Sequence, residues 1–353
     1  MTVTSEEKCV MKVGVLSGGG DAPGINAVLR AIVRKAIQEY GYEIVGIKDG
    51  WRGLVDGEFM PLDLDNTSGL LPRGGSMLGT SRTNPFKNSG DAERIMRNVS
   101  EQGIEAIIVI GGEDTLGVAS KLCEMGLPAV GVPKTIDNDL VGTDYSFGFQ
   151  TAVAIACEAL DRLHTTAEAH HRVILLEVMG RYTGWIALEA GIAGGAEVIL
   201  IPEKPFDIEE VCGCISGRLK RGKNFSVIVV AEGAKPKGGE EVVYSAGVDE
   251  FGHERLGGVG YYVGKEIEKR FENIETRVVV LGHLQRGGSP VAFDRVLATR
   301  FGIAAIDLVH EGKFGLMVAI QGNRIGSVPL KDIAGKRKTV DPTLYDIAAT
   351  FCG

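Results

Sequence analysis

The chain has 353 residues, of which 44% are hydrophobic and 24% are charged, and its formal net charge is -8 at pH 7. These values are typical of a folded globular protein, and they argue against a disordered chain and against a nucleic-acid partner bound through a basic surface. Since no segment reaches the about 18 uninterrupted apolar residues of a membrane span and the N-terminus has no signal-peptide core, we expect a cytoplasmic protein that binds no membrane.

Short apolar runs rich in β-branched residues recur along the chain and predict strands that are covered on both faces. Segments of helical periodicity lie between most of them, for example at 152–163. Strands that alternate with helices predict parallel, doubly wound sheets, and the chain is long enough for two lobes with a cleft between them. The predicted strands are 12–17, 42–47, 105–110, 128–132, 172–178, 196–201, 225–231, 276–282 and 314–320, and the polar, glycine-rich stretches 64–90 and 234–258 are predicted as long loops.

Ligands of such sheets bind at the carboxyl ends of the strands, so the residues directly after each run are the candidate site. The first run ends in SGGGDAPGIN, residues 17–26, before a helix from about Ile25. A glycine turn at a helix N-terminus favours anion binding over the alternative of a turn that only packs the helix on the sheet. Pro23 stands where a dinucleotide fingerprint needs its third glycine, and GRLKRGKN at 217–224 lacks the Ser or Thr of a Walker loop.

The strand at 105–110 is followed by the sequence GGEDT, residues 111–115. Two glycines and two acids before a helix suit a hydrated cation that bridges phosphate oxygens, because Mg²⁺ needs one or two carboxylates beside water and substrate phosphate. A helix N-terminus stabilised by acidic residues explains this stretch alone equally well.

The next strand is followed by PKTIDND, residues 133–139, which places a lysine and two carboxylates within a few positions. Phosphoryl transfer to an alcohol needs a carboxylate that takes the hydroxyl proton, and cations that neutralise the phosphate charge. A solvated turn is the alternative, but three anion or cation features at strand ends favour the catalytic interpretation. Such a site would carry out phosphoryl transfer.

Later strand ends carry further charged residues. Arg181 follows EVMG, Glu232 follows SVIVVA, and Arg277, His283 and Arg286 flank the strand at 276–282. Arginines there suit a sugar phosphate through charge-assisted hydrogen bonds. His283 alone would more often be a structural histidine, and its neighbour Arg286 favours a binding role.

Taken together, GGGDAPGIN, GGEDT, PKTIDND, EVMGRYTGW and LGHLQRGGSP occur in this order over nearly the whole chain and resemble the 6-phosphofructokinase family. The resemblance implies an α/β fold with two doubly wound, mainly parallel-sheet lobes and an active site in the cleft between them. It implies transfer of a phosphoryl group to the 1-hydroxyl of fructose 6-phosphate, in glycolysis, with Mg²⁺ as cofactor. It also implies that residues 11–148 and 285–335 form the donor lobe and that residues 149–284 and 336–353 form the fructose 6-phosphate lobe.

The same resemblance implies roles for single residues. Asp137 corresponds to the general base, Thr135, Asp139 and Arg181 support it, and Glu113 stands where the family usually has a metal-binding aspartate. Since Arg172 and Arg277 are expected to reach a neighbouring subunit, we expect a homodimer or homotetramer. The implied donor site is Gly20, Arg82, Gly112, Asp114 and Lys134, and the implied sugar-phosphate site is Thr135, Asp137, Arg172, Met179, Gly180, Arg181, Glu232, Arg277, His283 and Arg286.

Two departures from the nucleotide-using members concern the phosphoryl donor. Those members have glycine where this chain has Asp114, and many bacterial members also have glycine in place of Lys134. A carboxylate at 114 repels and obstructs an α-phosphate, and a lysine at 134 suits a short, highly charged donor. The pair resembles the pyrophosphate-dependent members, so we expect inorganic pyrophosphate with Mg²⁺ as the donor and a readily reversible reaction.

Two alternatives remain at this point: an ATP-dependent 6-phosphofructokinase, and a non-catalytic sugar-phosphate sensor. A sensor has no need of a proton acceptor beside a metal site, so the intact set of Asp137, Asp139 and Gly20 argues against it. The nucleotide effector site of the bacterial ATP-dependent members is matched only at Arg30 and Arg34. Allosteric control by nucleotides is therefore not expected.

Overall fold

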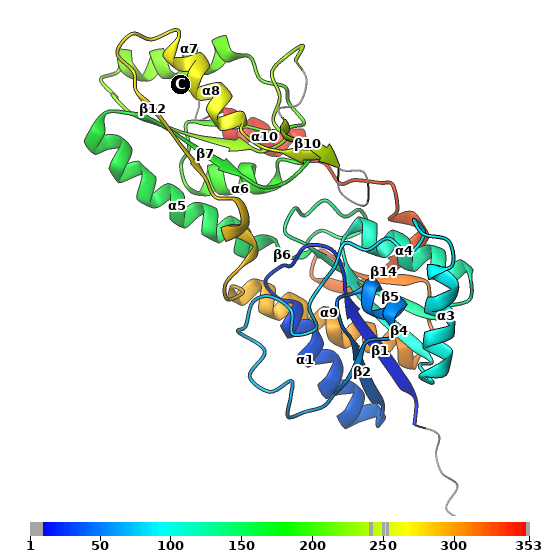
Figure 1. Ribbon diagram of the computed structural model, residues 1–353. Helices are drawn as coiled ribbons and strands as arrows, with labels where there is room; N and C mark the ends of the chain where they lie inside the picture. The colour runs from blue at the N-terminus through cyan, green and yellow to red at the C-terminus, as the bar shows by residue number, and fades with distance from the viewer. Residues whose placement is uncertain (1–9, 240–242, 249–250, 252–253, 351–353) are drawn as a thin grey trace, which may run out of the picture. The chain divides into compact units, whose positions relative to one another are not determined.

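The computed structural model describes residues 10–239, 243–248, 251 and 254–350. They divide into two compact units that are interleaved in sequence, drawn in Figure 1 mainly in blue, cyan and orange (unit 1) and mainly in green and yellow (unit 2). Unit 1 contains the chain up to Lys134, Gly142–Asp144 and Arg295–Lys336, and unit 2 contains Thr135–Val141, Tyr145–Asp294 and the chain from Arg337. The predicted lobes change over at 148/149, 284/285 and 335/336, whereas the main changes between the units lie at 134/135, 294/295 and 336/337.

Unit 1 is built on a sheet with the strand order β14-β13-β5-β4-β1-β2-β3. Neighbouring strands from β13 to β2 are parallel, and the two edge strands, β14 and β3, pair antiparallel. Every residue of β4 is buried, as expected for a strand covered by helices on both faces. The strands are β1 (Lys12–Ser17), β2 (Glu43–Ile47), β3 (Phe59–Leu62), β4 (Ala106–Gly111), β5 (Ala129–Thr135), β13 (Leu316–Gln321) and β14 (Arg324–Pro329).

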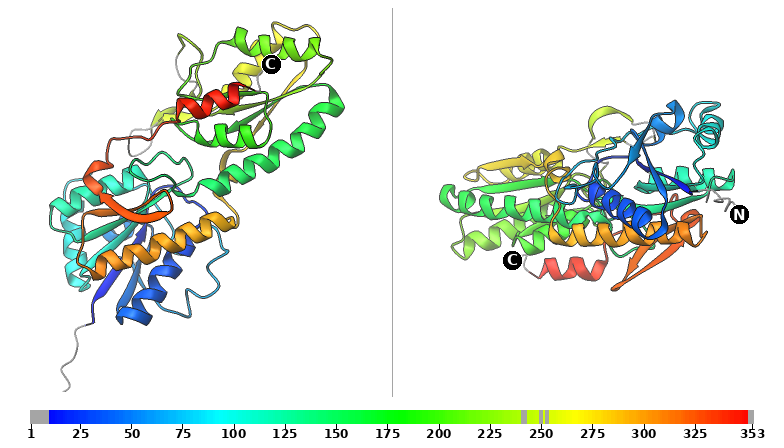
Figure 2. Two further views of the ribbon diagram at one scale, coloured as in Figure 1. Left: turned by 180° about the vertical axis from the view of Figure 1, so that it is seen from behind. Right: turned by 90° about the horizontal axis from the view of Figure 1, so that it is seen from below.

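Helices cover this sheet. In Figure 2 α9 (orange) runs alongside α1 (blue), and the two pack so closely that a Cβ at Gly302 would lie 2.7 Å from the Val28 carbonyl oxygen. Within the described ranges of both units, every helix is too short or too polar to cross a lipid bilayer. The helices are α1 (Ile25–Lys35), the π-helix η1 (Ala36–Tyr40), α2 (Trp51–Asp56), α3 (Asp91–Glu101), α4 (Glu113–Glu124), α9 (Ala292–His310) and η3 (Leu330–Asp332).

Unit 2 is built on a parallel sheet with the strand order β12-β7-β9-β8. Its core packs the apolar faces of α7 and α8 against this sheet, through residues such as Ile215, Ile228 and Val263. The strands of this sheet are β7 (Val173–Val178), β8 (Val198–Leu200), β9 (Ser226–Ala231) and β12 (Thr276–Val280), and unit 2 also contains the two-residue strand β6 (Phe147–Gly148), which is not part of this sheet. The helices are α5 (Phe149–His170), α6 (Trp185–Ala193), α7 (Ile208–Lys220), α8 (Val259–Glu268), η2 (Gly282–Arg286) and α10 (Pro342–Ala349).

The predicted α/β class with mainly parallel sheets is confirmed, and each predicted run contains a strand. Residues 64–90 contain no helix or strand, as predicted. The prediction of a loop over 234–258 is wrong, because β10 (Val243–Val248) and β11 (Glu254–Leu256) form an antiparallel pair there. The edge strands β3 and β14 were also not predicted. β3 is four residues long and contains Pro61, which only an edge position tolerates well.

Candidate active site

The turn after β5, which we name the acidic loop (Thr135–Asp139), has a fixed local conformation. The Asp137 N–H donates to Thr135 Oγ1 at 3.0 Å, and Ser146 Oγ donates to the Thr135 carbonyl at 2.7 Å. Asn138 has a φ of 52°, in the left-handed region that asparagine enters more readily than most residues. Its side-chain Oδ1 accepts the Ser146 N–H at 3.1 Å. Asn138 thus sets the directions in which the two flanking carboxylates leave the chain.

Asp137 is the most unusual residue of the acidic loop. Its side chain is buried, at 6% exposure, and its Oδ1 has no hydrogen-bond partner in the part of the chain that the structure describes. A buried polar atom without a partner costs free energy, so such atoms call for an explanation. A substrate hydroxyl that donates its proton to Oδ1 would supply the missing partner.

Two carboxyl groups in this region have raised pKa values, mainly because they are buried. Burial, and after it the Asp137 carboxylate, raises the pKa of Asp139 to about 7, although Arg337 and Arg181 act in the opposite direction. Burial likewise raises the pKa of Glu232 to about 7, against the effect of the Arg181 N–H. Asp137, Asp139, Arg181 and Glu232 therefore lie within electrostatic reach of one another in unit 2.

Contacts between the loops after β7 and β9 fix the backbone conformation around Arg181 and Glu232. The Arg181 N–H donates to Glu232 Oε1 at 3.0 Å, and a Cβ at Gly233 would lie only 2.0 Å from the Arg181 carbonyl oxygen, so this position needs glycine. Gly180 has a φ of 143°, and a Cβ there would lie 2.5 Å from the Thr183 carbonyl oxygen. Thr183 Oγ1 in turn donates to the Asp137 carbonyl at 3.3 Å, which joins these loops to the acidic loop.

The other residues predicted for the sugar-phosphate site in this part of unit 2 are Arg286, His283 and Met179, and they differ in burial. Arg286, at the end of η2, is buried and lowers the pKa of Glu232, so it lies within electrostatic reach of that carboxyl. His283, in the same short helix, is exposed. Met179 is half-buried between the end of β7 and Gly180.

Arg172 and Arg277 lie at the opposite end of the unit 2 sheet. Arg172 precedes β7 and Arg277 is the second residue of β12, and both pair with Glu275. Arg181 and Arg286 follow the carboxyl ends of the same two strands. A single chain therefore does not bring Arg172 or Arg277 together with the acidic loop.

In unit 1, the glycine turn (Gly18–Gly20) follows β1. The Gly18 N–H donates to the Ile110 carbonyl at 2.9 Å, and the Gly19 N–H donates to the Ser81 carbonyl at 2.8 Å. These two amides are used by the backbone, so the predicted anion site depends on Gly20 and on side chains. The residue after Ser81 is Arg82, which is exposed.

The Lys134 ammonium lies at the glycine turn. Its side chain is buried, at 3% exposure, and its Nζ donates to the Gly20 carbonyl. A Cβ at Gly19 would lie 3.3 Å from the same Nζ, and one at Gly112, the N-cap of α4, would lie 3.5 Å from the Lys134 carbonyl oxygen. Gly20, Gly112 and Lys134, which the sequence assigned to one donor site, thus lie together in unit 1.

Thr115 is a residue whose importance was not predicted. It lies in the first turn of α4 and is buried, and a Cβ at Gly18 would lie 2.7 Å from its Cγ2. A Cβ at Gly111 would approach its Cβ to 2.4 Å. Thr115 therefore sets how closely the glycine turn approaches the N-terminus of α4, where Asp114 stands. Its place in the GGEDT motif was the available signal.

Glu113 is the first residue of α4, and its Oε1 accepts the Gly335 N–H at 2.7 Å. Among the described residues, no three His, Cys, Asp or Glu side chains gather as a set that could hold a metal ion. Mg²⁺ commonly takes one or two carboxylates and completes its shell with water and substrate phosphates. Glu113, which directly follows the N-cap Gly112, would fit that mode as a single carboxylate ligand.

The family model described as phosphofructokinase matches residues 12–309, which is more than half of the chain. The chain belongs to the phosphofructokinase family.

Relatives of this phosphofructokinase divide by the donor in their names. The pyrophosphate–fructose 6-phosphate 1-phosphotransferase of Streptomyces coelicolor is 58% identical over 97% of this chain and 100% of its own length. The ATP-dependent 6-phosphofructokinase of Mycobacterium bovis is 53% identical over the same shares of the two chains, 97% and 100%. The solved phosphofructokinase of Saccharomyces cerevisiae superimposes with a TM-score of 0.79 at 32% identity, over 91% of this chain and 45% of that chain.

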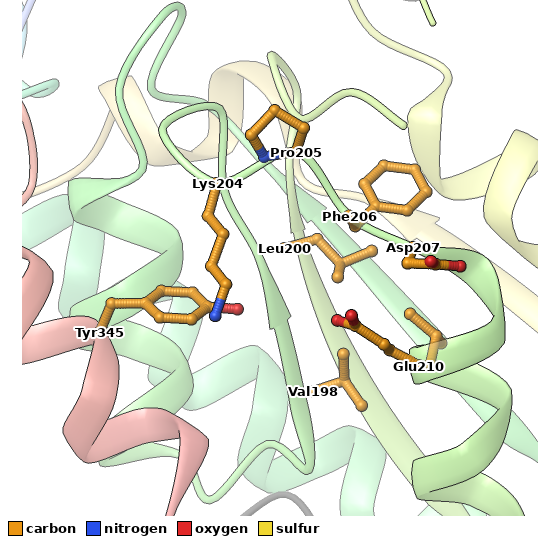
Figure 3. Close-up of a pocket in the computed structure, with 9 residues that line it drawn as sticks. Val198, Leu200, Lys204, Pro205, Phe206, Asp207, Glu210 and Tyr345 are labelled. Carbon is orange, nitrogen blue, oxygen red and sulfur yellow. The ribbon is translucent and has the colours of Figure 1, made fainter. Parts of the chain in front are cut away.

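A separate pocket of this phosphofructokinase lies in unit 2, and its lining includes none of the predicted site residues (Figure 3). Its volume is about 80 Å³, with Val198 and Leu200 of β8 on its floor. The Lys204 ammonium extends over the Tyr345 ring, 4.4 Å from the ring centroid. Since none of its lining residues belongs to the acidic loop or the glycine turn, it forms no part of the candidate active site.

The raised pKa of Glu232 predicts a pH dependence of stability. The pKa rises from an ordinary value of 4.5 to about 7 on folding, so the unfolded chain releases a proton that the folded protein keeps. The free energy of unfolding of the wild type should therefore fall as pH rises from about 4.5 to about 7 because of this group. Glu232→Gln keeps an Oε1 acceptor for the Arg181 N–H and does not titrate.

The measurement is the melting temperature of both proteins between about pH 4.5 and 8. We expect the melting temperature of Glu232→Gln to increase relative to that of the wild type as pH rises through this window, and the difference between them to level off above it. Glu101→Gln, at an exposed position, is the control for the general effect of a Glu→Gln substitution on the melting temperature across this pH range. A difference that stays constant across the window would contradict the raised pKa.

Proposed function

We propose that this phosphofructokinase is pyrophosphate-dependent and works in the cytoplasm. It transfers a phosphoryl group from inorganic pyrophosphate to the 1-hydroxyl of fructose 6-phosphate, and it yields fructose 1,6-bisphosphate and phosphate. The observation that most supports this proposal is the buried Lys134 ammonium, which donates to the Gly20 carbonyl of the glycine turn. A cation built into this turn matches a short donor with all of its charge close to the reacting bond.

On the acceptor side, Asp137 takes the proton of the 1-hydroxyl through its Oδ1, to which none of the described residues donates a hydrogen bond. The hydroxyl oxygen then attacks the transferred phosphorus, the bond to the bridging oxygen breaks, and phosphate leaves. Arg181, within electrostatic reach of Asp139, adds positive charge to the region where phosphate charge develops. These groups lie in unit 2.

On the donor side, Gly20, Gly112, Arg82 and Lys134 bind pyrophosphate. Lys134 neutralises the phosphate that leaves, and it directly precedes Thr135 of the acidic loop in the chain. When bound, Mg²⁺ neutralises phosphate charge. Glu113 would hold it as a single carboxylate ligand.

Asp114 disfavours ATP as the donor. It lies in the first turn of α4, next to Thr115, whose side chain packs beneath the glycine turn. A carboxylate at that place repels an additional phosphate and occupies the space of a nucleoside tail. The pyrophosphate-dependent name of the Streptomyces coelicolor relative supports this proposal, and the ATP-dependent name of the Mycobacterium bovis relative makes ATP the second candidate.

Arg172 and Arg277 have a role only in an oligomer. Because they lie at the far end of the strands that lead to Arg181 and Arg286, they cannot serve the same site within one chain. We propose that they reach the sugar phosphate bound by a neighbouring subunit of a homodimer or homotetramer. His283 and Arg286 then complete the sugar-phosphate site from the chain that supplies Asp137.

The donor is tested by assaying purified protein with fructose 6-phosphate, Mg²⁺ and either pyrophosphate or ATP. We expect kcat/KM for pyrophosphate to exceed that for ATP by about a hundredfold or more. The reverse reaction, from fructose 1,6-bisphosphate and phosphate, should proceed at a comparable rate. Chelation of Mg²⁺ should abolish turnover, and added Mg²⁺ should restore it. Rapid turnover with ATP and none with pyrophosphate would overturn the proposal.

A further inference from the structure

A segment close to the C-terminus of the described chain lies against the acidic loop within unit 2. The backbone N–H of Lys338 donates to the Asp139 carbonyl at 2.8 Å. The Lys338 ammonium donates to Asn138 Oδ1 at 3.1 Å, across 200 positions of sequence. Main chain and side chain of one lysine thus contact two consecutive residues of the acidic loop.

Lys338 is itself held in place. The Trp185 indole N–H, at the start of α6, donates to the Lys338 carbonyl at 3.0 Å. The Lys338 ammonium also lies 5.2 Å from the centroid of the Trp185 ring, within the range of a cation–π interaction. Two residues further on, the Val340 N–H donates to Glu203 Oε1 at 3.1 Å. These contacts hold Lys338 in place independently of its hydrogen bond to Asn138.

Asn138 needs such support. A non-glycine residue in the left-handed region costs free energy and persists only where its surroundings hold it. Asn138 has a φ of 52° and is buried, and its Oδ1 accepts both the Ser146 N–H and the Lys338 ammonium. Because Asn138 stands between Asp137 and Asp139, a rotation of its backbone turns both carboxylates.

We propose that Lys338 is a positioning residue for phosphoryl transfer: anchored on Trp185, it holds Asn138 in the left-handed conformation and so aims Asp137 at the acceptor hydroxyl. Lys338 acts through Asn138 and touches neither substrate. The inference rests on the proposed role of Asp137 as proton acceptor. It does not depend on which donor the enzyme uses.

The first test compares Lys338→Met with Lys338→Arg, using whichever donor the wild type prefers. Displacement of a catalytic base by about 1 Å can lower the rate about a hundredfold. We therefore expect Lys338→Met to lower kcat by about ten- to a hundredfold. KM for fructose 6-phosphate and for the donor should change by less than about threefold, because no binding group is lost. Lys338→Arg keeps a cation and hydrogen-bond donors, so it should recover most of kcat.

The control is Lys336→Met, which removes the same charge from an exposed side chain two positions away and should leave kcat unchanged. Melting temperatures are measured for all variants, since a purely structural lysine would change stability and leave kcat per folded molecule intact. A kcat of Lys338→Met within about twofold of the wild type overturns the inference.

A second test asks whether Lys338 acts through Asn138. Asn138→Gly keeps access to positive φ and removes the Oδ1 acceptor. If the contact between the two side chains carries the effect, Asn138→Gly combined with Lys338→Met should be no slower than the slower single variant. If the double variant shows a loss of kcat equal to the product of the two single losses, the two residues act independently, which would contradict the inference. A wild type that rejects pyrophosphate would overturn only the proposed donor, and the kcat comparison would still decide the role of Lys338.

Discussion

Replacing Asp137 by serine is expected to lower kcat by about a hundredfold or more, the magnitude of a lost general base. Oδ1 of Asp137 is buried and receives no hydrogen bond from the residues that the structure describes, so the substrate hydroxyl is its expected partner. Serine is too short and too weakly basic to take the proton at that place. Because Arg181, Glu232 and Arg286 remain, fructose 6-phosphate should still bind with a Kd within about threefold of the wild type, as titration calorimetry would measure.

The matched control is Asp161→Ser, which removes an exposed carboxylate on α5 and should leave kcat unchanged. Thermal unfolding shows whether each variant is folded. An Asp137→Ser enzyme that keeps more than about a fifth of the wild-type kcat would rule out Asp137 as the base. A folded variant that no longer binds the sugar would instead give Asp137 a binding role.

Replacing Asp114 by glycine is expected to admit ATP. Two like charges about 5 Å apart repel by about 3 kcal/mol at the effective dielectric of a protein surface. Removal of half of that repulsion corresponds to about a tenfold rise in kcat/KM for ATP. The variant also frees space in the first turn of α4, next to Thr115 and the glycine turn. Steady-state kinetics with ATP and with pyrophosphate measure the change in donor preference.

The matched control is Glu124→Gly, which removes one negative charge from the exposed end of the same helix and should leave donor preference unchanged. Glycine costs about 1 kcal/mol in a helix, so thermal unfolding must show that both variants are folded at the assay temperature. A folded Asp114→Gly enzyme that remains inactive with ATP would mean that exclusion at this position is not the main determinant of the donor.

Local sequence patterns were sufficient for most of the fold because a strand covered on both faces is apolar along most of its length. β1, β4, β7 and β9 are nearly continuous apolar runs and were predicted from their own residues. β14 and the β10–β11 pair escaped prediction because polar residues and glycines interrupt their apolar residues, and β3 escaped because it has only four residues and contains Pro61.

The sequence by itself determined the α/β class, the glycine turn after β1, and the carboxylates that follow β5, because each of these follows from residues close together in the chain. Only the tertiary structure decided that Thr115 meets Gly18 and that Lys338 meets Asn138. It also separated Arg172 and Arg277 from the acidic loop, because the two ends of a parallel strand lie at opposite edges of a sheet. Contacts made by chain folding over long separations leave no local pattern, so no reading of nearby residues could have supplied them.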